Sequence, residues 1–438
     1  MLITFTPHMA VPGAPARKGR APLLALLWLS FGLVTASPTQ PTFDEALRLA
    51  TNVSAAAKAS QASVAASSQA AARADQLSDP MLSLGLDNLP VSGPDKFRPN
   101  ADFMTMRRVG IEQEWVSKDK REARSTRAQR AVEVDEGLYL ERVASVREAT
   151  GKAWLTVFYK QKALALSQSI AREMEQDLST VRATHRGAKA TAGDVLQAKT
   201  ELILSGDSIQ VAEQELETAR INLRRWTRTE ISGVAEPAPE LTTHVPTLPV
   251  SDLERYHPTV LNARRAVSLA DADKTVAVRD RNPNWTFEAG FAQRSSQYSN
   301  MFSFGVKIPL NINRAQRQDR DIAEKSELGT KARLEYEEAL VDMQSTIQAL
   351  SAQLESLKRR VARLNAELLP AANQQVELAL ADYRAGTGTL SAVFRAKRVS
   401  LERRLQINAL EQEAALVWAS LELHVVPHVM ATQPRNAQ

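Results

Sequence analysis

The sequence predicts a mostly α chain with a small β part, built by internal duplication of one pattern. Ala, Leu, Glu, Gln, Arg and Lys are abundant while aromatic residues make up only 5%, a composition typical of long helices. Apolar residues recur at alternating steps of three and four over long stretches, whereas four shorter segments alternate apolar and polar residues. These two periods predict coiled-coil helices and strands with one apolar face.

The composition excludes several classes of chemistry. The chain has no cysteine, so it has neither a thiolate nucleophile nor a disulfide framework. Its six histidines are scattered without metal-ligand spacing, and we predict no metal site and no cofactor. Nucleophile elbows and phosphate loops are absent from the sequence, so we do not expect an enzyme. The net charge of +5 comes without a basic patch interleaved with aromatics, so nucleic acid is not an expected partner.

Residues 1–36 have the pattern of a signal peptide. Three basic residues, Arg17, Lys18 and Arg20, precede an apolar run at 21–34, and small residues follow up to Ala36. The run is short for a membrane-spanning helix, although a retained anchor is the alternative. At the other end, we predict that residues 426–438 form a disordered tail.

Two copies of one pattern follow the signal peptide. We place the first repeat at 37–228, a proline-rich connector at 229–251 and the second repeat at 252–425. Each repeat reads as helix, two strands, very long helix, turn and helix. The turn at 185–191 and the residues after it are similar to the turn at 383–389, and Asp79-Pro80 before the first strand corresponds to Asn282-Pro283. Self-similarity over so long a period indicates duplication.

The helices are predicted to be unusually long and paired. A helix from residue 118 to about residue 182 would span on the order of 95 Å at 1.5 Å per residue. In the second repeat, an unbroken coiled-coil seam is expected through Tyr336, Leu340, Met343, Ile347, Leu350, Leu354, Leu357, Val361, Leu364 and Leu368. Such lengths suit the wall of a tube better than a globular domain.

The four alternating segments carry apolar residues on one face. They are Leu82, Leu84 and Leu86; then Phe103, Val109, Ile111 and Trp115; then Trp285, Phe287, Ala289 and Phe291; and finally Phe302, Phe304, Val306 and Ile308. This pattern fits a membrane barrel and also a half-buried soluble sheet. Since four strands cannot close a barrel around a channel, a membrane-crossing sheet would have to be shared by several chains.

With these features the chain resembles the TolC-like outer-membrane efflux protein family. The resemblance rests on residues 42–47 (TFDEAL), 79–85 (DPMLSLG), 109–113 (VGIEQ), 304–310 (FGVKIPL), 368–372 (LLPAA) and 383–386 (YRAG), taken in order across both copies. It implies a homotrimer in the outer membrane. Three chains would share a twelve-stranded β-barrel, four strands each, continuous with a periplasmic α-barrel of long antiparallel coiled-coil helices.

The same resemblance implies a function and partners. A periplasmic adaptor and an inner-membrane pump of the resistance-nodulation-division type would dock below the duct, and outer-membrane lipid would surround the barrel. Within the family the chain is most similar to the heavy-metal cation efflux branch of the cobalt-zinc-cadmium type, on the opening of the first strand and on residues 118–121 and 311–316. Multidrug efflux and a type I secretion duct are alternatives, and a periplasmic coiled-coil scaffold is an alternative from another class.

The two turns between long helices are the expected site for adaptor docking or gating. The resemblance places this site at Arg186, Gly187, Asp194, Lys199, Arg384, Gly386, Thr389, Arg395 and Lys397. The chain departs from the family pattern here, because Ala392 and Arg395 stand where acidic residues are frequent. Two structural alternatives apply: Asp194 would cap its helix, and the basic residues would cover a solvated helical end.

Overall fold

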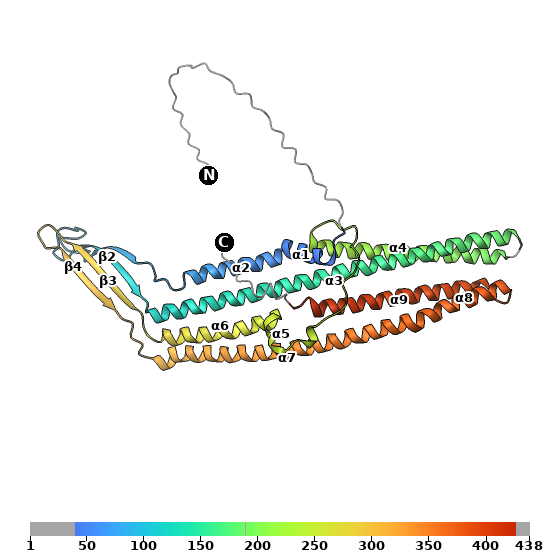
Figure 1. The fold of residues 1–438 in the computed structure, drawn as a ribbon. Coiled ribbons are helices and arrows are strands. Elements are labelled where there is room, and N and C mark those ends of the chain that lie inside the picture. Colours follow the sequence, from blue (N-terminus) through green and yellow to red (C-terminus); the bar gives the residue numbers. More distant parts are fainter. Residues whose placement is uncertain (1–39, 189, 426–438) are drawn as a thin grey trace, which may run out of the picture. The chain divides into compact units, whose positions relative to one another are not determined.

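Long helices and one four-stranded sheet make up the part of the chain that the structure describes (Figure 1). The computed structural model describes residues 40–188 and 190–425, which belong to one unit. The predicted signal peptide and the predicted tail lie outside these residues.

The same order of elements occurs twice. The first copy contains α1 (Phe43–Val53), α2 (Ala55–Ala72), β1 (Met81–Asp87), β2 (Met106–Trp115), α3 (Lys118–Arg186) and α4 (Ala192–Thr227). The second contains α5 (Val250–Tyr256), α6 (Pro258–Asp280), β3 (Trp285–Gln293), β4 (Met301–Lys307), α7 (Gln318–Arg363), α8 (Leu369–Ala385) and α9 (Leu390–Glu422). The prediction of a mostly helical chain with a small β part is confirmed.

Hydroxyl side chains start the helices where the sequence offers them. Thr42 and Glu45 form a capping box at α1, in which the Thr42 Oγ1 accepts the Glu45 N–H at 3.3 Å and Glu45 accepts the Thr42 N–H at 2.9 Å. These bonds satisfy amide groups that have no partner inside the helix. Thr191 and Asp194 form the same box at α4.

The helix α3 is the longest element and confirms the length prediction. Its 69 residues correspond to roughly 100 Å at 1.5 Å per residue. The helices α2, α4, α6 and α9 all pack against it.

The helix that carries the predicted seam in the second copy changes its geometry near the end of the seam. A π-helical segment, Leu364–Leu368, separates α7 from α8. The cause is Pro370, which has no N–H to donate and whose ring clashes with the carbonyl four residues earlier. The preceding turn therefore widens. Before the break the seam holds, with Met343, Ile347, Leu354 and Leu357 buried.

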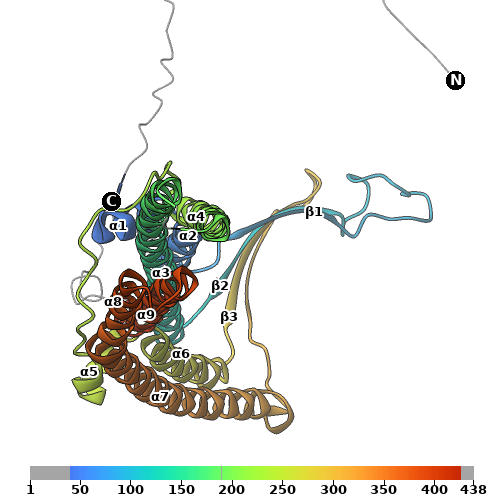
Figure 2. The ribbon, with the colours of Figure 1, turned by 90° about the vertical axis from the view of Figure 1, so that its right-hand side faces the viewer.

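The helices form a single row and not two packed layers. In one half the order of contacts is α2, α3, α6 and α7, and in the other half α4 and α9 lie beside α3 while α8 lies beside α9. Figure 2, which looks along the helices, shows this row as an open arc with the short helices α1 and α5 on one side.

The largest core lies at mid-length of this row. Trp154 of α3 is fully buried there; its Nε1–H donates to the Pro41 carbonyl at 2.9 Å and its ring meets Phe43 edge-on at 5.4 Å. Trp418 of α9 donates to the Thr242 carbonyl at 2.7 Å. These bonds tie the connector and the N-terminus of α1 to the long helices.

The helices α6 and α9 lie end to end between α3 and α7 (Figure 1). Gly151 of α3 faces this junction, and a Cβ added there would lie 2.3 Å from the end of the Leu423 side chain just beyond α9. A larger residue at this position would therefore displace the Leu423 side chain.

Candidate functional site: the sheet and the helical tips

The sheet is antiparallel in the order β1-β2-β3-β4, and its register aligns the predicted apolar positions. One row across the strands contains Leu82, Ile111, Ala289 and Phe304, and the next contains Leu84, Val109, Phe291 and Phe302. All four strands therefore present their apolar residues on one continuous face. This confirms the alternation read from the sequence.

The second predicted strand begins later than expected. Phe103 was predicted to belong to it, but β2 begins at Met106. Phe103 instead packs between loops, where its carbonyl accepts the Arg294 Nε–H at 3.0 Å and its ring lies 6.5 Å from that of Tyr298. A contact between distant loops overrides the local alternation here.

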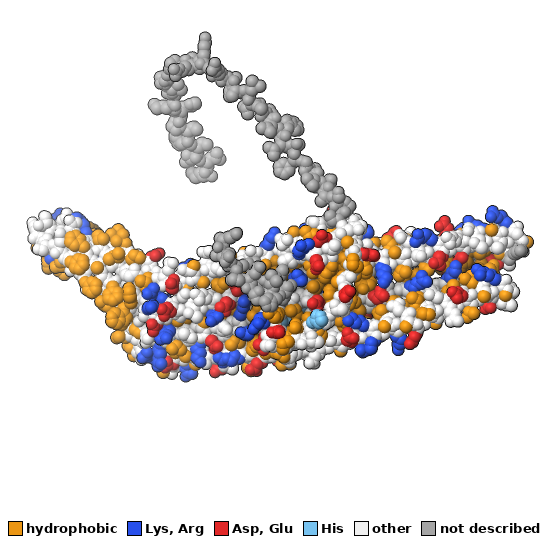
Figure 3. All heavy atoms as spheres, viewed as in Figure 1, with side chains coloured by type: hydrophobic (Ala, Val, Ile, Leu, Met, Phe, Trp, Pro, Cys, Tyr) orange, Lys and Arg blue, Asp and Glu red, His pale blue; other side chains and the backbone are white. Residues whose placement is uncertain are grey.

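The apolar face of the sheet is uncovered. Leu84 is 73% exposed and Phe302 is 74% exposed. Figure 3 shows hydrophobic side chains gathered over the strand end of the molecule. A continuous apolar surface of this kind is costly in water at about 25 cal/mol per Å² and indicates an interaction with lipid or protein.

The opposite face of the sheet is polar and carries ion pairs. Lys307 of β4 lies between Glu288 of β3 at 2.7 Å and Glu112 of β2 at 2.9 Å. Glycines make room for these side chains: a Cβ at Gly305 would lie 2.6 Å from the Glu288 carboxylate. The sheet thus has one face suited to lipid and one suited to water.

Both edges of the sheet are open within the described chain. There, β1 pairs with β2 and β4 pairs with β3, so the outer backbone groups of β1 and β4 face outward. Open edges of this kind are sites for pairing with another chain.

Exposed apolar residues also occur on the helices at the two ends of the row. On α4 these are Leu196, Ile203 and Val211, each at least 51% exposed. On α7 they include Leu334 at 59% and Val341 at 61%. Spacings of seven and eight residues place each set on one stripe of its helix. Both outer helices therefore carry a stripe suited to a further helix.

The helical tips hold the residues predicted for adaptor docking. Arg186, Gly187, Lys199, Arg384, Gly386, Thr389 and Arg395 are exposed there. Asp194 lies in the first turn of α4 and completes the capping box by accepting the Thr191 N–H at 2.9 Å, and Thr389 caps α9, accepting the Ala392 N–H at 3.3 Å. The structural alternative for Asp194 is therefore realised in its geometry.

Lys397 differs from the other tip residues. Its side chain is only 12% exposed and forms an ion pair with Asp177 of α3. One residue further along α9, Arg398 pairs with Glu201 of α4 at 3.4 Å. These two contacts hold the hairpin of α8 and α9 against the hairpin of α3 and α4. No local motif in the sequence predicts them.

An apolar cluster lies beneath these ion pairs. Phe394 and Leu390 of α9 are buried against Leu178 and Val181 of α3 and Ala198 of α4. The two tips are therefore packed together, with an apolar interior and a largely basic, solvent-facing surface.

No described helix is both long and apolar enough to cross a membrane.

No family model matches the sequence, and no curated protein matches it. Solved structures do match. CusC, described in terms of conformational changes accompanying folding and transmembrane channel formation, has a TM-score of 0.73 at 15% identity, covering 89% of this chain and 94% of that one. The outer membrane protein VceC from Vibrio cholerae has a TM-score of 0.71 at 15% identity, covering 88% and 96%. The CmeC outer membrane channel of Campylobacter jejuni has a TM-score of 0.71 at 11% identity, covering 94% and 93%.

These likenesses show the fold of this chain. It is the fold of outer-membrane channel proteins, and the neighbours are channels and not enzymes. The scores are nearly equal among the three, so they do not single out a heavy-metal branch.

Proposed function

We propose that this protein is the outer-membrane duct subunit of a tripartite efflux system and works as a homotrimer. The observation that carries the proposal is the sheet, which has an uncovered apolar face, an ion-paired polar face and two open edges. Joined to a single row of long helices, it has the form of one segment of a closed wall. The likeness to outer-membrane channels supports the same conclusion.

In this proposal three chains complete one tube. The β1 edge of one chain pairs with the β4 edge of the next, giving twelve strands whose apolar face meets lipid and whose polar face lines the duct. The apolar stripes of α4 and of α7 pack between neighbours in the periplasm. The duct conducts passively, while an inner-membrane pump of the resistance-nodulation-division type and a periplasmic adaptor supply energy and coupling.

Cysteine cross-linking tests the shared sheet, because the chain has no cysteine of its own. We would combine Ser83→Cys on β1 with Ser303→Cys or Lys307→Cys on β4, all on the polar face. Within one chain β1 and β4 are three strand spacings apart, roughly 14 Å, which exceeds the roughly 7 Å that a disulfide spans. A disulfide must therefore join two chains.

We expect at least one double variant to give dimer and trimer bands that disappear on reduction, while Ser83→Cys alone stays monomeric under denaturing conditions. If no pair cross-links in membranes that contain the folded protein, the shared sheet is wrong.

We propose that the exposed basic residues of the tips dock the adaptor or hold the gate. Arg395→Asp reverses one of these charges without removing a contact within the described chain, so it should change export or resting leak and leave the trimer intact. Arg359→Asp, the same change at an exposed site on α7, is the control. Normal export and normal leak in Arg395→Asp would remove Arg395 from this role.

The cargo that we propose is heavy-metal cations, on the sequence resemblance at residues 118–121 and 311–316. Deleting the gene and measuring the inhibitory concentrations of zinc, cobalt, cadmium, copper, silver and a drug set tests this. Sensitivity confined to metals supports it. Sensitivity confined to drugs or dyes keeps the duct and reassigns its cargo.

A further inference from the structure

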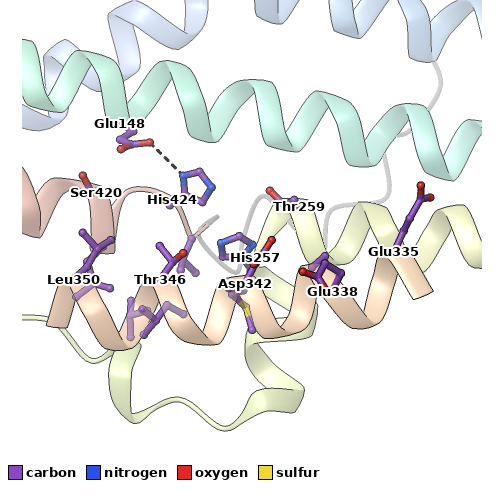
Figure 4. A pocket seen from close by; sticks show the side chains of 16 residues that line it. Glu148, His257, Thr259, Glu335, Glu338, Asp342, Thr346, Leu350, Ser420 and His424 are labelled. Carbon is purple, nitrogen blue, oxygen red and sulfur yellow. Dashed lines mark hydrogen bonds and ion pairs between the residues drawn. The ribbon is translucent and has the colours of Figure 1, made fainter. Parts of the chain in front are cut away.

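A cavity of about 580 Å³ lies at the junction where α9 ends and α6 begins (Figure 4). The helix α7 forms one wall, α3 contributes Glu148, and the segment before α5 contributes Val245. Sites for small organic molecules have volumes of roughly 300–1,000 Å³. The space is therefore the right size for one such molecule.

The inner surface of the cavity is mostly apolar. Met343, Ile347 and Leu350 from α7 and Leu421 from α9 line it. An occupant with an apolar body would exchange water for these side chains at about 25 cal/mol per Å² of buried surface.

Carboxylates surround the apolar surface. Glu335, Glu338 and Asp342 follow one another along α7, and Glu148 lies across from them on α3, whereas no Lys or Arg is among the described residues that line the cavity. Glu338 and Asp342 form no ion pair within the described chain, while Glu335 pairs with Lys331 at 3.4 Å. Two negative charges at the mouth are therefore available to an incoming cation.

Two histidines complete the cavity, and His257 adds no compensating positive charge beside Asp342. Figure 4 shows the rings of His257 and His424 between Glu148 and Asp342, with their centroids 4.9 Å apart. His424 Nδ1 lies 3.2 Å from the Glu148 carboxylate. Burial and the neighbouring His424 lower the pKa of His257 to about 4, so His257 is neutral at pH 7.

We propose that this cavity binds a hydrophobic organic cation, with its apolar body against α7 and α9 and its charge at Glu338 and Asp342. In the described part of the chain no three His, Asp or Glu side chains are grouped so as to hold a metal ion, which favours an organic cation. The site lies within one chain, so the inference does not depend on the proposed conduction. Because α3, α6, α7 and α9 all contribute, an occupant would hold this junction together.

Tetraphenylphosphonium and tetraphenylborate are matched probes, equal in shape and opposite in charge. Binding would be measured by calorimetry on the full-length protein in nanodiscs, with empty nanodiscs subtracted. We expect saturable binding of the cation and no saturable binding of the anion. The combined change Glu338→Gln and Asp342→Asn should weaken cation binding at least tenfold.

Glu327→Gln is the control, since it removes one negative charge from an exposed site on α7 outside the cavity and should leave binding unchanged. Thr346→Trp, at an exposed position of the lining, should fill the cavity and abolish binding while the circular dichroism spectrum stays that of the wild type. Equal binding of both ions, or full binding by the double variant or by Thr346→Trp, would overturn the proposal. The binding assay measures neither conduction nor cross-linking. The duct proposal can therefore fail in its own tests without affecting this result.

Discussion

In each copy the first helix is interrupted at a corresponding position, but different side chains surround the two interruptions. In the first copy α1 gives way to α2 at Ser54, and in the second α5 gives way to α6 at His257. Both breaks lie 26 residues before the proline that precedes the strand, Pro80 or Pro283. The two copies thus share the same spacing between this break and the strand that follows.

The chemistry at the two breaks diverged. Ser54 caps α2, accepting the Ala57 N–H at 3.2 Å. His257 makes no cap bond, and its Nδ1 is buried with no hydrogen-bond partner among the described residues. The first break is thus capped by a side chain, while the second leaves a buried ring nitrogen unpaired at the edge of a cavity.

The largest expected effect lies in the first copy. Trp154→Ala removes a fully buried ring and its hydrogen bond to Pro41, so the free energy of unfolding should fall by about 3–5 kcal/mol. Leu350→Ala, beside the cavity of the second copy, is the comparison and should cost about 1–2 kcal/mol, because part of its environment is already empty. Denaturant titration in detergent measures both, and equal losses would contradict the contrast.

The second expected effect is a pH dependence of the free energy of unfolding that comes from His257 in the second copy. His257 takes up a proton at about pH 4 in the folded chain and near its ordinary value of 6.5 when unfolded. Above pH 6.5 His257 is neutral in both states and does not reduce the free energy of unfolding. As the pH falls from 6.5 toward 4, the unfolded chain takes up the proton first and the free energy of unfolding decreases. By pH 5 the loss is roughly 2 kcal/mol.

His257→Phe keeps a ring and removes the titration, so its stability should fall less between pH 7 and pH 5 than that of the wild type. In the folded chain Glu148 does not titrate between pH 7 and pH 5 and therefore does not contribute to this difference. Burial opposes its ionisation, but hydrogen bonds from His424 and Lys152 outweigh burial and lower its pKa to about 2. Parallel pH profiles for both proteins would refute the assignment to His257.

A smaller effect is expected at the cap of the first copy. Ser54→Ala removes the acceptor for the Ala57 N–H and should cost about 1 kcal/mol. His257→Ala at pH 7 removes no such bond. Hydrogen exchange in the first turn of α2 should become faster in Ser54→Ala, while exchange in the first turn of α6 should change less in His257→Ala. Faster exchange in α6 alone would contradict this expectation.

The smallest effect separates the glycines at the two tips. Gly386 has φ +77°, whereas Gly187 has φ −86° and the following Ala188 takes the left-handed conformation. Gly386→Ala should therefore cost about 1 kcal/mol and Gly187→Ala less than about 0.5 kcal/mol. Thermal denaturation of the two variants measures the difference, and equal shifts would show that backbone conformation does not govern these tips.

Local periodicity predicted much of the fold. The start of α3 at Lys118 and the alternation of Leu82, Leu84 and Leu86 follow from properties of neighbouring residues. The predicted docking residues at the tips remain a proposal. The π-helical turn before Pro370 was not predicted, because the heptad pattern reports which residues are apolar and not the width of a turn.

The sequence by itself determined which segments are helices or strands and which face of each is apolar, because these depend on residues within a few turns of one another. Only the tertiary structure decided that Lys307 lies between Glu112 and Glu288, that Lys397 pairs with Asp177, and that the end of α9 meets the start of α6 beside an unfilled space. The partners in these contacts come from different helices or strands. Which side chains meet there depends on how far each element is shifted along its neighbour, and a one-dimensional pattern does not contain that shift.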